Sequence, residues 1–315
     1  MSPNRIDVHH HFVPEFYKDA VITSGGDPSG WQVPAWDLKI DADVNKKFQI
    51  GTTILSLTAP GACILKEPQA AADLARKTNE LTAKIRDDNP KEYGFFAALP
   101  NLLDKEHTLK EIAYSLDVLK ADGVTLFTRY GSDNHYLGHP DFKDIWDELN
   151  RRSAVILVHP THPVDTAQVS GLPQPVIRYP FETTTTALDM IYNKTVKNNP
   201  NCKIILSHAG GTLPYLIGRP TSIFCKTEEE IAEFWEQARD FYYDVAVAGT
   251  ENVLKILETF AKPDHILYGS DTPYANDDII NFHTTRLDKY EFADPKMWDA
   301  INRGNSLKLF PRLKN

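Results

Sequence analysis

The 315-residue sequence lacks long apolar segments and is poor in cysteine. No stretch approaches the roughly 20 consecutive apolar residues that cross a bilayer, and the N-terminus lacks the charged-then-apolar pattern of a secretory signal. The three cysteines are scattered, which argues against the disulfide framework of a small secreted protein. We therefore expect a cytoplasmic protein that is not inserted in a membrane.

Basic clusters and glycine-rich loops are also missing. The net charge is −9 and the pI is about 5.7, which argues against a nucleic-acid partner because phosphate backbones need clustered Lys and Arg. No glycine-rich loop follows an early apolar run, as a dinucleotide-binding fold would require. With 42% hydrophobic and 24% charged residues, the composition is that of a globular protein with a sizeable core.

Short apolar runs recur along the chain and predict eight strands. They are rich in β-branched and aromatic residues, and nearly continuous apolarity is typical of strands that are covered on both faces. The predicted strands are residues 5–9, 52–57, 93–99, 123–127, 154–159, 202–207, 241–245 and 264–270.

Amphipathic stretches between these runs predict helices. In residues 106–121, Leu109, Ile112 and Leu116 keep a helical period. The other predicted helices are residues 69–87, 141–152, 183–196, 227–238 and 250–261. Alternating strands and helices imply parallel pairing through right-handed crossovers, so we expect a (β/α)8 TIM barrel in one domain over residues 1–315.

Two predicted connections are unusually long. They cover residues 12–50, after the first strand, and residues 160–180, which contain five prolines, after the fifth. Long ordered loops inside a compact domain are usually lids or binding loops. Both follow the carboxyl end of a strand, which is the catalytic face of this fold, so we expect both to border the site.

Three consecutive histidines, His9, His10 and His11, follow an apolar segment near the N-terminus. Successive side chains of a strand alternate between faces, so His9 and His11 are expected to point the same way and His10 the other. Two imidazoles on one face suit a metal ion, because histidine is the commonest metal ligand. A hydrogen-bonded buried pair and the remnant of an affinity tag are the alternatives.

Polar residues also end three later strands, at His159, His208 and Asp271. In a barrel these positions meet at one mouth. His159 and Asp271, together with His9 and His11, would form a nitrogen and oxygen sphere for one divalent ion, with room for water or substrate. His208 would then be free for acid–base chemistry. Each residue alone could instead be a cap or a core hydrogen-bonding group.

These motifs carry a resemblance to a known family. Residues 6–11, 159–160, 207–211 and 268–273 resemble the amidohydrolase superfamily, and more narrowly its decarboxylase branch, which contains aminocarboxymuconate-semialdehyde decarboxylase and γ-resorcylate decarboxylase. The similarity extends over nearly the whole chain. In its N-terminal segment and its size, the chain is most similar to the 6-methylsalicylate decarboxylases of polyketide pathways.

The resemblance implies a site with defined roles. It implies a metal ion held by His9, His11, His159 and Asp271, and catalysis by His208 and Asp271, either of which could deliver a proton to the substrate. No lysine stands at the end of the fourth predicted strand, which implies one metal ion. Histidine as the first ligand favours Zn²⁺, with Mn²⁺ as the other candidate.

The resemblance also implies a reaction and partners. The expected substrate is a small aromatic carboxylate, a 2-hydroxybenzoate, and the expected reaction converts 6-methylsalicylate to 3-methylphenol and CO₂. We expect a homodimer or a dimer-based tetramer in which Arg219 reaches the partner's site to bind the substrate carboxylate, although a surface ion pair is the alternative role of Arg219. Phe12, Trp31 and Tyr274 are candidate aromatic walls of the substrate pocket.

Two other functions stay open from the sequence. A metal-dependent hydrolase acting on a lactone or an amide would use the same barrel and the same ligands, so only the resemblance favours decarboxylation. A non-catalytic scaffold is the second alternative. A scaffold would have no use for an unligated His208 beside an open coordination position.

Overall fold

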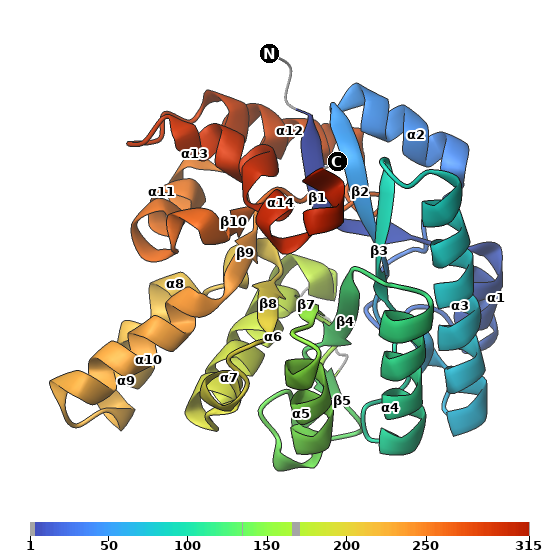
Figure 1. The fold of residues 1–315 in the computed structure, drawn as a ribbon, viewed down its shortest axis with the longest axis horizontal. Coiled ribbons are helices and arrows are strands. Elements are labelled where there is room, and N and C mark those ends of the chain that lie inside the picture. The colour runs from blue at the N-terminus through green and yellow to red at the C-terminus, as the bar shows by residue number, and fades with distance from the viewer. Residues whose placement is uncertain (1–3, 134, 166–170, 315) are drawn as a thin grey trace.

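The centre of the molecule is a barrel of parallel strands (Figure 1). The computed structural model describes residues 4–133, 135–165 and 171–314. The eight barrel strands, in spatial order, are β1 (Arg5–Phe12), β2 (Ile50–Leu57), β3 (Tyr93–Ala97), β4 (Gly123–Phe127), β7 (Val155–His159), β8 (Lys203–Leu206), β9 (Tyr242–Asp244) and β10 (Ile266–Leu267). A separate antiparallel hairpin joins β5 (Arg129–Tyr130) to β6 (His135–Tyr136).

Backbone hydrogen bonds between β1 and the residues that directly follow β10 close the barrel. Val8 N donates to Tyr268 O (3.1 Å), and Asp271 N donates to His9 O (2.8 Å). All other neighbouring barrel strands pair in parallel. The predicted (β/α)8 architecture is confirmed. Several strands are shorter than predicted, most of all β10.

Helices surround the barrel (Figure 1). They are α1 (Glu15–Thr23), α2 (Leu38–Lys47), α3 (Pro68–Asp88), α4 (Lys105–Ala113), α5 (Lys143–Arg151), α6 (Gln174–Tyr192), α7 (Thr195–Asn198), α8 (Leu213–Leu216), α9 (Gly218–Phe224), α10 (Glu228–Asp240), α11 (Glu251–Phe260), α12 (Asp277–Lys289), α13 (Lys296–Asp299) and α14 (Ser306–Leu309). No helix among the described residues has both the length and the apolar character needed to cross a membrane.

The two long connections differ from the sequence expectation. The segment between β1 and β2 contains α1 and α2, so it is partly helical. The second connection was predicted to continue as a loop to Pro180, which is wrong because α6 already begins at Gln174. Pro175 lies in the first turn of α6, where a missing N–H costs little, and buried Tyr179 anchors this part of the helix to the protein.

The interior of the barrel has an apolar end and a polar end. Its apolar end is a cluster of buried side chains that includes Phe310 and Leu313, near the C-terminus of the chain. The cluster contains Ile6, Val8, Ile54, Phe96, Val155, Leu157, Ile205, Leu267, Phe310 and Leu313. Close packing there leaves no room for solvent or substrate, so only the carboxyl ends of the strands can hold an accessible site.

A bulge in β1 turns the histidine run toward that accessible end. Asp7 pairs with Thr53 and His10 with Leu55, so β1 carries one more residue than β2 in this interval. Val8 therefore faces the apolar cluster, and His9 also faces inward. His10 points away, toward α2. The predicted alternation of His9 and His11 against His10 is confirmed.

Candidate metal centre

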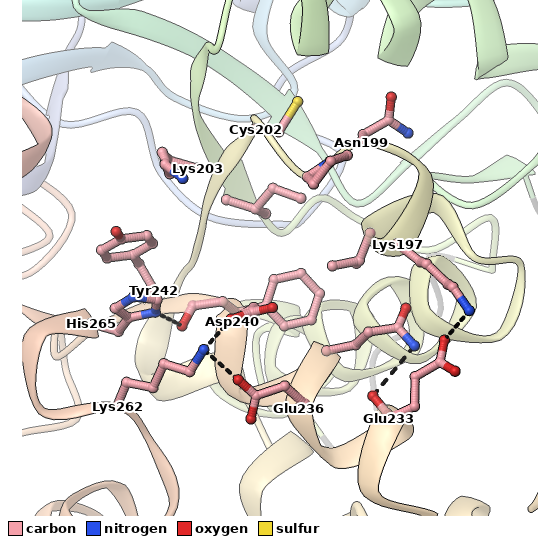
Figure 2. A pocket seen from close by; sticks show the side chains of 15 residues that line it. Lys197, Asn199, Cys202, Lys203, Glu233, Glu236, Asp240, Tyr242, Lys262 and His265 are labelled. Atoms are coloured by element: carbon pink, nitrogen blue, oxygen red, sulfur yellow. Dashed lines mark hydrogen bonds and ion pairs between the residues drawn. The ribbon is translucent and has the colours of Figure 1, made fainter. Parts of the chain in front are cut away.

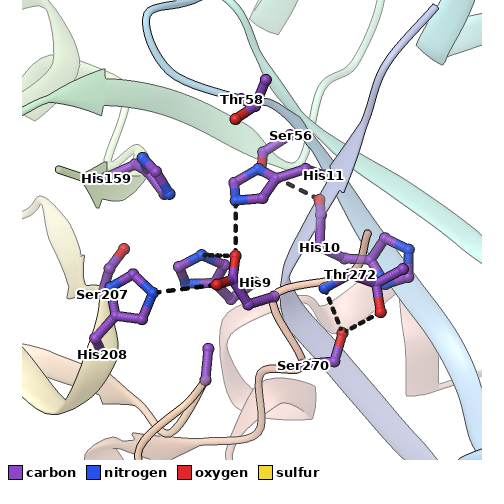
Figure 3. A network of polar contacts seen from close by, with 12 residues as sticks. His9, His10, His11, Ser56, Thr58, His159, Ser207, His208, Ser270 and Thr272 are labelled. Carbon is purple, nitrogen blue, oxygen red and sulfur yellow. Dashed lines mark hydrogen bonds and ion pairs between the residues drawn. The ribbon is translucent and has the colours of Figure 1, made fainter. Parts of the chain in front are cut away.

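Four side chains converge at the mouth of the barrel. His9 and His11 come from β1, His159 ends β7, and Asp271 follows β10. One ligand atom of each lies within 4.8 Å of those of the others. Asp271 Oδ1 is 3.4 Å from His9 Nε2 and 3.3 Å from His11 Nε2. Figure 3 shows the rings of His11, His159 and His208 facing a common space, with His9 below it.

Each of the three imidazoles is oriented by a hydrogen bond through its Nδ1 atom. The pairs are His9 Nδ1 with Asp244 Oδ2 (2.8 Å), His11 Nδ1 with Ser56 Oγ (3.0 Å), and His159 Nδ1 with Pro160 O (2.7 Å). The Nε2 atoms of His9 and His11 are buried and have no hydrogen-bond partner. Ligating histidines in metalloproteins are held in this way by groups behind the ligands.

The unpartnered nitrogens fit a divalent metal ion. Burying a polar atom without a partner is unfavourable, and an ion among three imidazoles and a carboxylate would satisfy these atoms together. Such a mixed donor set suits Zn²⁺ and other divalent transition ions. The residues present therefore fit the group that the sequence predicts.

The charges of the site also suit an ion. Burial lowers the pKa of His11 and, together with the neighbouring histidines, lowers the pKa of His159 well below its usual value, so both rings are neutral, as metal ligation requires. Burial alone would raise the pKa of Asp271, but the nearby imidazoles of His11 (3.3 Å) and His208 (3.6 Å) hold it well below its usual range. Asp271 is therefore available as a carboxylate.

His9 is the exception among the three imidazoles. Burial opposes its protonation, but the carboxylates of Asp244 and Asp271 outweigh burial and raise the pKa of His9 to about 10. A protonated His9 places a positive charge between the carboxylates of Asp244 and Asp271. An arriving metal ion would take over that role and release the proton.

The backbone around Asp271 allows the candidate ligands to approach one another closely. A Cβ atom on Gly269 would lie 2.7 Å from the Cβ of His9, so only glycine lets the segment after β10 approach β1 this closely. Asp271 has φ 67° and His208 has φ 54°, a left-handed conformation that is uncommon outside glycine. Strained residues of this kind cluster at functional sites.

His208 stands next to the four candidate ligands. Its Nε2 is 3.6 Å from Asp271 Oδ2, its Nδ1 is buried without a partner, and its backbone N donates to Asp244 Oδ1 (3.0 Å). Asp244 thus connects His9 to His208, a role that the sequence analysis missed. A carboxylate at the end of the apolar run 241–245 was the signal that could have found it.

A cavity of about 310 Å³ opens beside the centre and is lined by His11, His159, His208 and Asp271. Two of the predicted aromatic walls, Trp31 and Tyr274, line the cavity. The Tyr274 ring lies 5.7 Å from the His11 ring. Tyr179, another aromatic residue near the second long connection, also lines the cavity, and the remaining wall residues are Asp27, Ser29, Thr58, Ala59, Pro175, Val176, Pro180, Val247, Ala275 and Ile279.

Two predicted substrate residues lie elsewhere. Phe12 is buried against Trp36, with ring centroids 5.6 Å apart, and is not part of the cavity wall. Strand alternation puts it on the outward side with His10, so the prediction of a pocket wall at Phe12 is corrected. Arg219 is exposed in α9 and does not line the cavity of its own chain. A role for Arg219 across a subunit interface stays a prediction.

Comparisons with known proteins agree with this geometry. Residues 6–312 match the family model described as Amidohydrolase. The chain is 48% identical to a 6-methylsalicylic acid decarboxylase of Penicillium expansum and 49% identical to one of Aspergillus aculeatus, each over 98% of this chain and 97% of the relative.

One of the similar solved structures is 5-carboxyvanillate decarboxylase of Novosphingobium aromaticivorans in complex with manganese and 4-hydroxy-3-methoxy-5-nitrobenzoic acid. The TM-score is 0.84 at 19% identity, over 98% of this chain and 96% of that chain, which is a likeness of fold. The family match covers nearly the entire sequence and includes all four candidate ligands. This chain therefore belongs to the amidohydrolase family.

Proposed function

We propose that this chain is a metal-dependent decarboxylase that converts 6-methylsalicylate to 3-methylphenol and CO₂ without oxidation. The observation that carries the proposal is the identity of 48% and 49%, over nearly full length, to two relatives with that named activity. The three imidazoles and one carboxylate at the barrel mouth support it, because they provide the donor set of a divalent ion beside a cavity of suitable size for one aromatic ring.

Decarboxylation of an aromatic ring has one main chemical difficulty. If the bond to the carboxylate breaks first, its electron pair remains on the ring carbon as an unstable anion. Protonating that carbon beforehand removes the problem, and an ionised hydroxyl group on the neighbouring carbon makes the protonation easier. A divalent ion held by His9, His11, His159 and Asp271 would supply Lewis-acid stabilisation to the phenolate and carboxylate oxygens.

His208 and Asp271 are the acids that we assign to this protonation. Both line the cavity, and their side chains are 3.6 Å apart, so a proton can be held between them and given to the ring carbon that bears the carboxylate. The carbon–carbon bond then breaks, its electron pair returns to the ring, and CO₂ leaves. Trp31 and Tyr274 in the wall hold the ring in place for this step.

The metal and the assembly are finer parts of the proposal. We propose one ion per chain, with Zn²⁺ favoured by the three imidazoles and Mn²⁺ as the alternative. We also propose a homodimer or a dimer-based tetramer. Exposed apolar side chains on α6, α8 and α9 support such an interface; they are Phe181, Tyr192, Tyr215, Ile223 and Phe224. Arg219 lies on α9 among them, which supports its predicted reach into a partner's site.

The substrate assay tests the reaction. Metal-loaded protein is incubated separately with 6-methylsalicylate, salicylate and 2-methoxy-6-methylbenzoate, and phenolic product and CO₂ are quantified. We expect turnover of 6-methylsalicylate, a kcat/KM about 10- to 200-fold lower for salicylate because one methyl contact is lost, and no turnover of the ether, which has no ionisable oxygen. Comparable turnover of the ether would contradict the mechanism.

The same preparation tests the alternative hydrolase. A panel of lactones and amides is followed for ring opening or cleavage under the same conditions. Rapid hydrolysis without any turnover of salicylates would replace decarboxylation with the hydrolase function, because both reactions would use the same ligand residues.

A further inference from the structure

Asp27 places a second carboxylate in the wall of the substrate cavity. It lies in the segment between α1 and α2, and its Oδ1 accepts a hydrogen bond from the backbone N–H of Ser29 (2.8 Å). Burial raises the pKa of the Asp27 carboxyl, which opposes its ionisation, whereas hydrogen bonds from Ser29 lower the pKa and favour the carboxylate. The mechanism above gives this carboxylate no role, although it faces a cavity proposed to bind an anion.

The wall offers a second carboxylate no lysine or arginine of this chain. The lining residues that the structure describes include neither lysine nor arginine, and none of the residues outside the described ranges is lysine or arginine in the sequence. The two positive charges of a divalent ion would therefore be balanced by the carboxylates of Asp271 and Asp27. An Arg219 from a second copy would bind only the substrate carboxylate that leaves as CO₂.

We infer that Asp27 is a specificity-determining residue that restricts the cavity to aromatic acids with a single carboxylate. This inference rests on the proposed function. A cavity of about 310 Å³ is only about 8 Å across if it is taken as a sphere, which is close to the distance over which physiological salt screens charge. A second carboxylate on the substrate would therefore be close enough to Asp27 for their repulsion to escape screening by salt. It would also lose its hydrating water without gaining a cation as a partner.

The first carboxylate escapes this repulsion because it binds at the metal centre. Repulsion of any other carboxylate also orients the ring, since the acid group can enter favourably only toward His9, His11 and His159. Rejection by an unfavourable charge is a common way to obtain specificity. It leaves an uncharged substituent, such as a methyl group, free to occupy the rest of the wall.

The test compares a monoacid with a diacid. The kcat/KM values of metal-loaded protein are measured for salicylate and for 4-hydroxybenzene-1,3-dicarboxylate, which is salicylate with a second carboxylate. In Asp27→Asn we expect the ratio of diacid to monoacid to rise at least about tenfold, the scale of one unfavourable charge contact. Asp27→Glu, which keeps the charge, should retain the low ratio.

Asp19→Asn is the matched control. Asp19 is exposed on α1, outside the cavity wall, so this variant makes the same change of net charge without altering the cavity. We expect it to keep the ratio of the unsubstituted protein. A ratio in Asp27→Asn that equals the control's ratio would overturn the inference.

A binding measurement separates this inference from the proposed function. The affinities of zinc-loaded protein for benzoate and for benzene-1,3-dicarboxylate, neither of which has a phenol, are measured by calorimetry. Failure of the protein to decarboxylate any salicylate would refute the proposed function alone, and a rise in relative diacid affinity in Asp27→Asn would still support the role of Asp27. An unchanged affinity ratio would refute that role whatever the catalysis.

Discussion

Two hollows of this protein differ in size and in chemistry. The larger, about 500 Å³, is a groove on the outer surface beside α7, β8 and α10 (Figure 2). There Lys197 lies 2.6 Å from Glu233, and Lys262 lies 2.6 Å from Glu236 and also contacts Asp240. The smaller is the cavity at the barrel mouth, about 310 Å³. The larger hollow holds charges that neutralise one another, whereas the smaller holds buried nitrogens without partners.

The difference shows why size alone does not identify a functional site. Ion pairs in contact with water are worth about 0 to 1 kcal/mol each, so the groove needs no ligand to be stable. Buried imidazole nitrogens without partners are costly, and a protein keeps them where a bound group satisfies them. His9, His11 and His208 meet that description. The comparison predicts which substitutions matter and which do not.

The largest effect is expected at the metal ligands. His159→Ala should lose the ion and essentially all activity, because three of the four donors cannot hold it at the same affinity. A chelator should remove activity from the unsubstituted protein, and Zn²⁺ or Mn²⁺ should restore it. Metal content by elemental analysis and kcat are the measurements.

His139→Ala is the matched control for that prediction. His139 belongs to a partly exposed group with His135 and Asp141 whose atoms are also close enough to hold an ion, so the control corrects for metal bound outside the barrel mouth. It should keep activity and the centre's ion. Full activity in a preparation free of metal would contradict the assigned centre.

A smaller loss is expected at His208. His208→Ala should retain the ion while kcat falls by about 10²-fold or more, the scale of a lost acid–base group. Metal content and kcat are measured on the same sample. If kcat stays unchanged, His208 has no part in the reaction, and proton delivery falls to Asp271.

A substitution at Asp244 tests whether the residues that hydrogen-bond the candidate ligands affect metal binding. Asp244→Asn removes the charge that orients His9 and should weaken metal affinity by about 10- to 100-fold, measured by competition with a chelating dye. Asp240→Asn, which removes a carboxylate from the surface groove, should leave metal affinity as it is. Equal affinities in the two variants would argue against the role of Asp244.

The smallest effect is expected in the groove. Glu236→Gln should lower the free energy of unfolding by less than about 1 kcal/mol and leave kcat/KM unchanged. Burial opposes protonation of Lys262, but the hydrogen bonds that its ammonium group donates to the carboxylates of Asp240 and Glu236 raise its pKa above 10.5. The stabilisation by the ion pairs of Lys262 is therefore complete below pH 10.5, the usual pKa of a lysine, and is lost as the pH rises through the raised pKa of Lys262. Urea unfolding of the variant and the unsubstituted protein at pH 7 and pH 11 measures the difference in the free energy of unfolding. A loss of activity in Glu236→Gln would contradict the distinction between the groove and the cavity.

Some features of the site follow from local sequence pattern. A period of two separates His9 and His11 from His10, and apolar runs that end in His159 and Asp271 locate two more candidate ligands. These patterns involve neighbours in the chain, so they can be read without a structure. The same period would have put Phe12 with His10, outside the cavity, and the aromatic character of Phe12 misled the prediction.

Other features depend on contacts between distant parts of the chain. Asp244 meets His9 across 235 positions, and Asp27 reaches the cavity because the segment between α1 and α2 forms part of its wall. The β1 bulge, which turns His9 inward with Val8, depends on pairing with β2. The sequence by itself determined the barrel and the candidate ligands, because strand periodicity and strand ends are local features. Only the tertiary structure decided which groups orient those ligands and which line the cavity, because burial and charge depend on neighbours that are far away in the chain.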